Sequence, residues 1–157
     1  QLFDYIYNTF KLYDINPENI EFEVTESAYL ENFTLSNKFF RRIGNMGCAI
    51  ALDDFGTGYS SLSYLTQINI DTLKVDRQFV MEIQTSERSR LVTGAIIDLA
   101  KRLSLSVCAE GIENLEQWNY LREHGCDNVQ GFMFSKPIPL SELTCSPSHY
   151  SDSSFSV

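Results

Sequence analysis

The sequence predicts an α/β fold in which repeated strand–helix units build a parallel β-sheet. Short apolar runs alternate with segments whose apolar residues recur at helical spacing. Five such runs fit into the 157 residues, with room for a helix between each pair. Because parallel strands need right-handed crossovers, two architectures remain open. One is an open doubly wound sheet, and the other is a (β/α) barrel, which takes about eight strands and about 250 residues when complete.

Each expected strand is a short apolar run with turn residues on either side. The first shows the pattern most clearly, because Phe22 and Val24 alternate with Glu21 and Glu23, so that successive side chains point to opposite faces of a sheet. The expected strands cover Ile20–Glu26, Cys48–Asp54, Thr72–Asp76, Ser106–Ile112 and Asn128–Phe132.

The expected helices show the 3.6-residue period between these strands. The opening segment reads as a helix that ends before Asn16-Pro17, and Asn114 followed by Gln117 resembles a capping box at the start of another. One apolar stripe is made by Phe39, Phe40, Ile43 and Met46. A second stripe is made by Leu91, Val92, Ala95, Ile96, Leu99, Ala100 and Leu103.

Composition narrows the class of protein. The net charge of −9 argues against nucleic acid as a partner, because binding its backbone requires a basic face. No apolar run approaches the roughly 20 residues that span a membrane, so we expect no membrane segment in this chain and a cytoplasmic location. Residues 144–157 contain little periodicity and several serines, and we expect a loose, disordered tail there.

Polar side chains stand near the carboxyl end of every expected strand, the edge at which parallel α/β folds form active sites. Solvated surface acids are the simpler interpretation, but their repetition at strand ends favours a site. Converging carboxylates recruit cations, and oxygen donors without His or Cys clusters suit Mg²⁺ or Mn²⁺. The residues concerned are Glu23, Asp53, Asp54, Lys74, Asp76, Glu110, Glu113 and Gln130.

The adjacent Asp53 and Asp54 end the second expected strand. Neighbouring side chains on a strand point to opposite faces, but a turn of the backbone at the strand end lets both reach one site. One carboxylate would then bridge two metal ions and the other would hold the second ion, an arrangement suited to phosphodiester hydrolysis with Lys74 beside the attacking water or the phosphate. The glycines of the following stretch, Phe55-Gly56-Thr57-Gly58, favour a mobile loop beside this site rather than a dinucleotide fingerprint.

Five stretches carry a family resemblance when they are taken in order. They are "FEVTES" (22–27), "ALDDFGTGYSSLSYL" (51–65), "IDTLKVD" (70–76), "AEGIE" (109–113) and "QGFMFSKPIP" (130–139). Together they resemble the EAL-domain cyclic di-GMP phosphodiesterases of bacteria, over about residues 3–143. The resemblance implies a TIM-like barrel and hydrolysis of the second messenger cyclic di-GMP to linear pGpG with two Mg²⁺ or Mn²⁺ ions. Residues 1–143 would be the C-terminal portion of such a domain, with about five of its eight parallel strands.

The resemblance also implies roles for individual residues. Lys74 resembles the residue that contacts the nucleophilic water, while Glu113 and Gln130 look like supporting polar residues. Glu26 resembles the residue that steadies the glycine loop, Phe55–Tyr59, and the family implies a homodimer through this loop and the following helix. The implied metal ligands are Glu23, Asp53 (bridging), Asp54 and Glu110 (direct or through water). The resemblance also implies a catalytic role for Glu110, as a candidate general base.

The sequence departs from the family pattern at its front. No Glu-Ala-Leu triplet occurs, and the metal-ligating asparagine of a later family strand has no counterpart, so we expect roughly three barrel strands to precede Gln1. We therefore expect this chain alone to be poorly stable and inactive, and its parent to be an active phosphodiesterase. The alternatives are an EAL-type receptor that binds cyclic di-GMP without cleaving it, a dimerising scaffold, and a barrel enzyme for another phosphoester.

Overall fold

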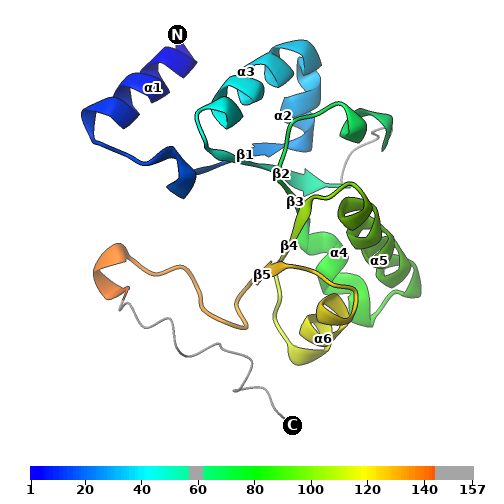
Figure 1. Ribbon diagram of the computed structural model, residues 1–157. Coiled ribbons are helices and arrows are strands. Elements are labelled where there is room, and N and C mark those ends of the chain that lie inside the picture. The colour runs from blue at the N-terminus through cyan, green and yellow to red at the C-terminus, as the bar shows by residue number, and fades with distance from the viewer. Residues whose placement is uncertain (57–61, 144–157) are drawn as a thin grey trace.

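The computed structural model describes residues 1–56 and 62–143 (Figure 1). Five parallel strands form one sheet in the order β1-β2-β3-β4-β5. Their bounds are Glu21–Thr25 (β1), Ala49–Phe55 (β2), Thr72–Val75 (β3), Ser106–Glu110 (β4) and Asn128–Gln130 (β5). All five predicted strands are confirmed. The expectations for Thr57, Gly58 and the tail 144–157 fall outside the described residues.

Within the described residues, six α-helices lie between or before the strands. Their bounds are Leu2–Leu12 (α1), Glu26–Glu31 (α2), Phe33–Asn45 (α3), Arg77–Met81 (α4), Glu87–Arg102 (α5) and Leu115–Glu123 (α6). Short 3₁₀ turns cover Pro17–Asn19, Leu62–Thr66, Glu82–Gln84 and Leu140–Glu142. The predicted capping box is confirmed, since Asn114 accepts from the Gln117 backbone N–H while the Gln117 side chain caps Asn114 in return. In the described part of the chain, no helix has the length and apolar character to cross a membrane.

The two faces of the sheet differ in chemistry. Ile50, Leu52, Leu73, Val75 and Val107 are fully buried and belong to the hydrophobic core. Helices α2 to α6 lie on this apolar side of the sheet (Figure 1). The parallel register places Glu23 beside Ala51, Ala51 beside Thr72, and Lys74 beside Cys108, all on the opposite face. The polar face is therefore continuous across the strands.

This topology decides between the two architectures that the sequence leaves open. A doubly wound sheet reverses its strand order at a switch point and carries helices on both faces. Here the strands follow one another in sequence order, and the crossover helices lie on one face (Figure 1). Sequential order with an outer helical layer is the arrangement of a TIM-like barrel, of which this sheet is a part.

The predicted stripe on α5 is wrong in its first half. Leu91 is 64% exposed, and Val92 and Ala95 are exposed as well, whereas Thr93 and Ile97 are fully buried. The helix packs on the sheet through Ser89, Thr93, Ile96, Ile97 and Ala100. The prediction counted only apolar residues, so it missed the buried Thr93. The hydroxyl of Thr93 is satisfied inside the helix, because it donates to the Ser89 carbonyl at 2.8 Å.

Several strand ends also differ from prediction, and each has a local cause. Glu26 begins α2 rather than ending β1, because Thr25 caps that helix through the Ala28 N–H. Asp76 caps α4 in the same way, by accepting from the Gln78 N–H at 2.7 Å. Strand β4 stops at Glu110, because Gly111 takes a left-handed φ of +74°. Strands β1, β3 and β4 therefore end earlier than predicted, where the chain turns at their carboxyl ends.

Candidate functional site

Three carboxylates from three different strands converge on one lysine. Lys74 of β3 places its Nζ 2.8 Å from Oε1 of Glu23, 3.4 Å from Oδ1 of Asp53 and 2.7 Å from Oε1 of Glu110. The lysine side chain is 6% exposed, and the carboxylates are more accessible. The polar edge predicted from the sequence therefore exists, and its first feature is an internal ion cluster around Lys74.

The protonation of Lys74 follows from this surrounding. Burial alone lowers the pKa of a lysine, because it penalises the charged form. The hydrogen bonds to Glu110 and Glu23, together with the charges of Glu110 and Asp53, outweigh that effect and raise the pKa above its ordinary value. Lys74 is therefore a fixed positive charge at neutral pH.

A β-bulge brings Asp53 and Asp54 together at the end of β2. The register pairs Leu52 with Leu73 and Phe55 with Val75, so that both aspartates stand opposite Lys74 alone. Asp54 has φ +55°, a left-handed conformation that few non-glycine residues adopt. Bulges re-aim side chains next to functional sites, and this one removes the strict alternation that would turn Asp54 away.

The environment of Asp54 differs from that of its neighbour. Burial, followed by the negative charges of Asp53 and Asp76, raises the pKa of the Asp54 carboxyl. A hydrogen bond with Asp76 acts in the same direction, and the positive charge of Lys74 opposes these effects. Such crowding of carboxylates is stabilised by an added cation or by a retained proton.

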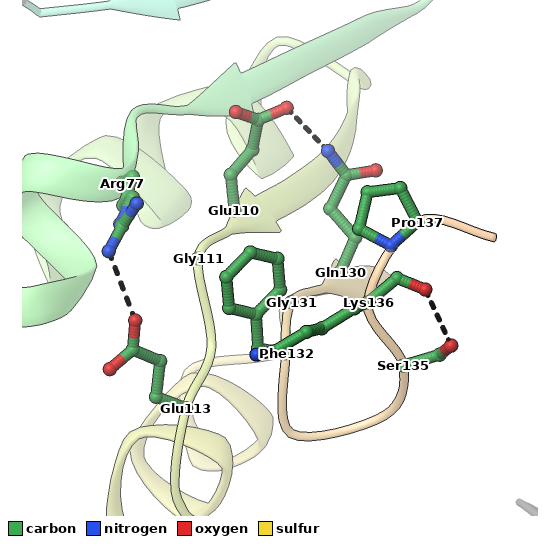
Figure 2. A pocket seen from close by; sticks show the side chains of 10 residues that line it. All are labelled: Arg77, Glu110, Gly111, Glu113, Gln130, Gly131, Phe132, Ser135, Lys136 and Pro137. Atoms are coloured by element: carbon green, nitrogen blue, oxygen red, sulfur yellow. Dashed lines mark hydrogen bonds and ion pairs between the residues drawn. The ribbon is translucent and has the colours of Figure 1, made fainter.

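The structure places the remaining predicted polar residues at two separate points. Gln130 of β5 donates from Nε2 to Oε1 of Glu110 at 2.7 Å, so it joins the lysine cluster. Glu113 does not reach Lys74. It pairs instead with Arg77, whose guanidinium nitrogen lies 3.0 Å from Oε1 of Glu113 (Figure 2). No pattern in the sequence predicts this pair, because Arg77 belongs to the helix after β3, whereas Glu113 follows β4.

A pocket of about 420 Å³ opens beside Glu110 and Gln130, at the carboxyl ends of β4 and β5. Figure 2 shows the Phe132 ring and the side chains of Lys136 and Pro137 next to these two residues. These three lining residues lie in the "QGFMFSKPIP" stretch, but nothing in their pattern marked them individually as site residues. The pocket joins an aromatic surface and a cation to the polar edge of the sheet.

The side chains of the site can be compared with those that bind divalent metal ions. Among residues 1–56 and 62–143, no three His, Cys, Asp or Glu side chains are gathered where they could hold a metal ion. The carboxylates are turned to the ammonium of Lys74, which already balances part of their charge. The donor type still fits Mg²⁺ or Mn²⁺, because every candidate ligand offers carboxylate oxygen. Cys108 lies beside Lys74 in the register, and burial raises the pKa of its thiol to about 11; sulfur is also a softer donor than Mg²⁺ or Mn²⁺ prefers.

Glu26 binds the chain just after Asp53 and Asp54, through Gly56 and Tyr64. It is buried at the start of α2 and accepts from the Gly56 backbone N–H at 3.2 Å through Oε2. Its other oxygen, Oε1, accepts from the hydroxyl of Tyr64. Phe55 is buried at the end of β2, and Gly56 follows with φ +93°. Glu26 thus contacts residues on both sides of positions 57–61.

Fold and site together define the class: part of a TIM-like β/α-barrel domain with an acidic site at the carboxyl edge of its strands. The chain belongs to the EAL domain family, whose model matches residues 1–137. The resemblance read from the sequence motifs is therefore confirmed.

Individual relatives agree with the family assignment. The chain is 48% identical to the signaling protein YkoW of Bacillus subtilis over 85% of its length, and 46% identical to the cyclic di-GMP phosphodiesterase NbdA of Pseudomonas aeruginosa over 79%. It spans 17% and 16% of those two proteins.

Solved structures agree as well. The PaMucR phosphodiesterase in complex with cyclic di-GMP matches with a TM-score of 0.86 at 35% identity, over 90% of this chain and 57% of that chain. The Klebsiella pneumoniae protein BlrP1 with manganese and cyclic di-GMP matches with a TM-score of 0.78 at 33% identity, over 85% of this chain and 34% of that one.

Proposed function

We propose that the chain is the C-terminal portion of a phosphodiesterase domain that hydrolyses cyclic di-GMP to linear pGpG in bacterial second-messenger signalling. The observation that carries the proposal is the convergence of Glu23, Asp53 and Glu110 on Lys74 at the carboxyl edge of the sheet. Relatives of the same family are named cyclic di-GMP phosphodiesterases, which supplies the substrate class.

The proposed metal ligands are Glu23, Asp53, Asp54 and Glu110. Two Mg²⁺ or Mn²⁺ ions at these carboxylates would activate a water molecule and stabilise the negative charge that develops on the phosphate. Calcium and manganese complexes among the structural neighbours support divalent ions in this family. The bulge supports the shared role of Asp53 and Asp54, because it places both opposite Lys74.

The other polar side chains of the site have proposed roles that do not involve binding a metal ion. Lys74, fixed as a cation, would hold the attacking water or a phosphate oxygen by hydrogen bonding once the carboxylates turn to their ions. Gln130 orients Glu110 through its 2.7 Å hydrogen bond. Glu113 and Arg77 pair 3.0 Å apart at the lining of the pocket, which supports a role for both in positioning the substrate.

The test is direct. Formation of pGpG from cyclic di-GMP is followed by chromatography with Mn²⁺, for this chain and for the full-length protein that carries it. Asp53→Asn should abolish turnover in the full-length protein, while Asp98→Asn, on the exposed side of α5, should leave it unchanged. Full activity in the Asp53 variant would refute the proposal. We expect no turnover by the isolated chain, which spans 57% of the PaMucR chain; robust turnover would contradict that expectation.

A cyclic di-GMP receptor without hydrolysis is the second candidate. It is favoured by one observation: the described carboxylates are turned to Lys74 rather than gathered around a metal position. Calorimetry in EDTA separates the two functions. A receptor binds cyclic di-GMP without metal and forms no pGpG when Mn²⁺ is added, whereas an enzyme releases pGpG.

Two further expectations are proposals as well. The domain forms a homodimer through the glycine loop region and the helix that follows it, and it acts in the cytoplasm. Mass photometry of the full-length protein tests the first. A mass that stays at that of one chain across the accessible concentration range would exclude the dimer.

A further inference from the structure

A buried carboxylate, that of Glu26, binds two residues that follow the acidic pair in the chain, Gly56 and Tyr64. Glu26 is 4% exposed and Tyr64 is 8% exposed. The Tyr64 hydroxyl donates to Oε1 of Glu26, and the Gly56 N–H donates to Oε2. Burial, followed by the hydrogen bond to Glu26, raises the pKa of Tyr64, so the hydroxyl keeps the proton that it donates.

The backbone that Glu26 holds is the end of strand β2. Asp54 has φ +55° and Gly56 has φ +93°, and such conformations persist only where surrounding contacts enforce them. A Cβ at Gly56 would lie 2.9 Å from the Phe79 ring, so this turn is packed closely against α4. The Gly56 N–H has moved past the β2–β3 ladder, and the Glu26 carboxylate is its acceptor. Gly56 follows Asp54 by two residues, so its anchoring bears on where both aspartates point.

We propose that Tyr64 is a positioning residue of the hydrolytic site, acting through Glu26 on Gly56 and thereby on Asp53 and Asp54. This role rests on the proposed function, because the two aspartates matter as ligands only there. In this role Tyr64 contacts neither the substrate nor a metal ion. The hydroxyl orients the Glu26 carboxylate so that its second oxygen meets the Gly56 N–H.

The physical reason is hydrogen-bond satisfaction. A buried carboxylate is stable only where donors compensate for the water it has lost. Without the Tyr64 hydroxyl, Oε1 of Glu26 loses the donor that it has among the described residues, and the carboxylate gains by rotating toward water. Gly56 then loses its acceptor, and the end of β2 samples conformations in which the carboxylates of Asp53 and Asp54 no longer share one site.

The test compares Tyr64→Phe with Tyr120→Phe. Tyr120 is a matched control, since it is 6% exposed and donates one hydrogen bond, at 2.6 Å, to the Arg90 carbonyl on the outer side of the barrel. Both variants remove one hydroxyl from a buried ring. Amide exchange at Gly56, read by NMR, should accelerate about fivefold in the Tyr64 variant, as expected for one lost hydrogen bond, and should not change in the control.

Function is then measured in the full-length protein. Because Tyr64 acts on the support of the ligands, Tyr64→Phe should weaken Mn²⁺ binding, measured by electron paramagnetic resonance, by about 10- to 100-fold. The kcat for cyclic di-GMP should fall by a similar factor while KM stays within about twofold. In a Glu26→Gln background the same change should add little, because the path through Glu26 is already broken.

Unchanged Gly56 exchange in Tyr64→Phe would overturn the inference. So would faster exchange with unaltered Mn²⁺ affinity, or effects of Tyr64→Phe and Glu26→Gln that simply add. If the wild-type protein binds Mn²⁺ but does not hydrolyse cyclic di-GMP, the proposed function fails, while exchange and metal affinity still decide the role of Tyr64.

Discussion

The ammonium of Lys74 lies 2.7 Å from Oε1 of Glu110, so an ion pair joins β3 to β4 at the carboxyl edge of the sheet. The same glutamate oxygen accepts from Gln130, which extends the connection to β5. Glu23 and Asp53 bring in β1 and β2 on the other side of the lysine. One cation therefore holds together polar groups from all five strands.

Replacing this cation should destabilise the chain. Lys74→Met leaves three carboxylates facing one another, and the free energy of unfolding at pH 7 should fall by about 1–3 kcal/mol, less than for a fully buried pair because the carboxylates are partly exposed. Mn²⁺ should then stabilise the variant more than the wild type, since no ammonium competes for the same oxygens.

The measurement is urea unfolding with and without Mn²⁺. Lys101→Met is the control, because its 2.6 Å pair with Asp127 is at the surface and should matter by less than about 1 kcal/mol. Equal stabilisation of variant and wild type by Mn²⁺ would contradict the competition between lysine and metal.

The pH dependence of stability follows from the raised pKa of Lys74. Its folded pKa lies above the ordinary 10.5, so its contribution is fully present below pH 10.5 and is lost as the pH rises through the folded value. The difference in unfolding free energy between wild type and Lys74→Met should therefore be constant near neutrality and shrink above pH 10.5. Unfolding curves from about pH 8 to about pH 12 check this; a difference that grows with pH would show the opposite sign of linkage.

Gly131 should tolerate no side chain. An added Cβ would lie 2.2 Å from the carbonyl oxygen and 2.3 Å from the nitrogen of Ile112, and these backbone atoms cannot give way as a side chain can. Gly131→Ala should lower stability by about 1–3 kcal/mol or more and weaken cyclic di-GMP binding, because Gly131 lines the pocket.

The matched variant for Gly131 is Gly125→Ala. Gly125 has open space around it but a φ of +77°, so alanine there should cost about 1–2 kcal/mol through backbone strain alone and leave ligand binding intact. Thermal unfolding and ligand titration of both variants separate crowding from strain. A larger effect on binding at Gly125 than at Gly131 would contradict the prediction.

Two aspartates at the opposite edge should matter for stability alone. Asp71 accepts from the Ile50 N–H at 2.9 Å, and Asp127 accepts from the Val107 N–H at 2.8 Å, so each satisfies the start of the preceding strand. Asp71→Ala and Asp127→Ala should each cost about 1–3 kcal/mol without changing Mn²⁺ affinity. If either variant kept the wild-type stability but lost Mn²⁺ binding, the purely structural role of that aspartate would be contradicted.

Asp127 also predicts an acid dependence. Burial favours a higher pKa, but the hydrogen bonds from Lys101 and the Val107 N–H outweigh it, and the pKa of Asp127 is lowered. Its contribution is present above pH 3.8 and is lost as the pH falls through the folded value. The difference between wild type and Asp127→Ala should therefore shrink below pH 3.8 in urea unfolding at acidic pH.

Much of the site could be predicted because it depends on local pattern and topology. The carboxyl ends of parallel strands meet at one edge, so Glu23, Asp53 and Glu110 could be placed together before any coordinates. Glu113 lies apart from the Lys74 cluster because it pairs with Arg77, which belongs to another βα unit. Leu91 was predicted on the apolar stripe of its helix but is exposed, because the face that a helix buries depends on the sheet beneath it.

The sequence by itself determined the five strands, the family and the identity of the polar residues at the strand ends, because these follow from alternation, spacing and motif order. Only the tertiary structure decided that Lys74 lies among three carboxylates, that a bulge sets Asp53 and Asp54 opposite it, and that Glu26 ties Tyr64 to Gly56. Each of these is a contact between residues far apart in the chain, and its geometry is fixed by how the strands register and where their ends turn.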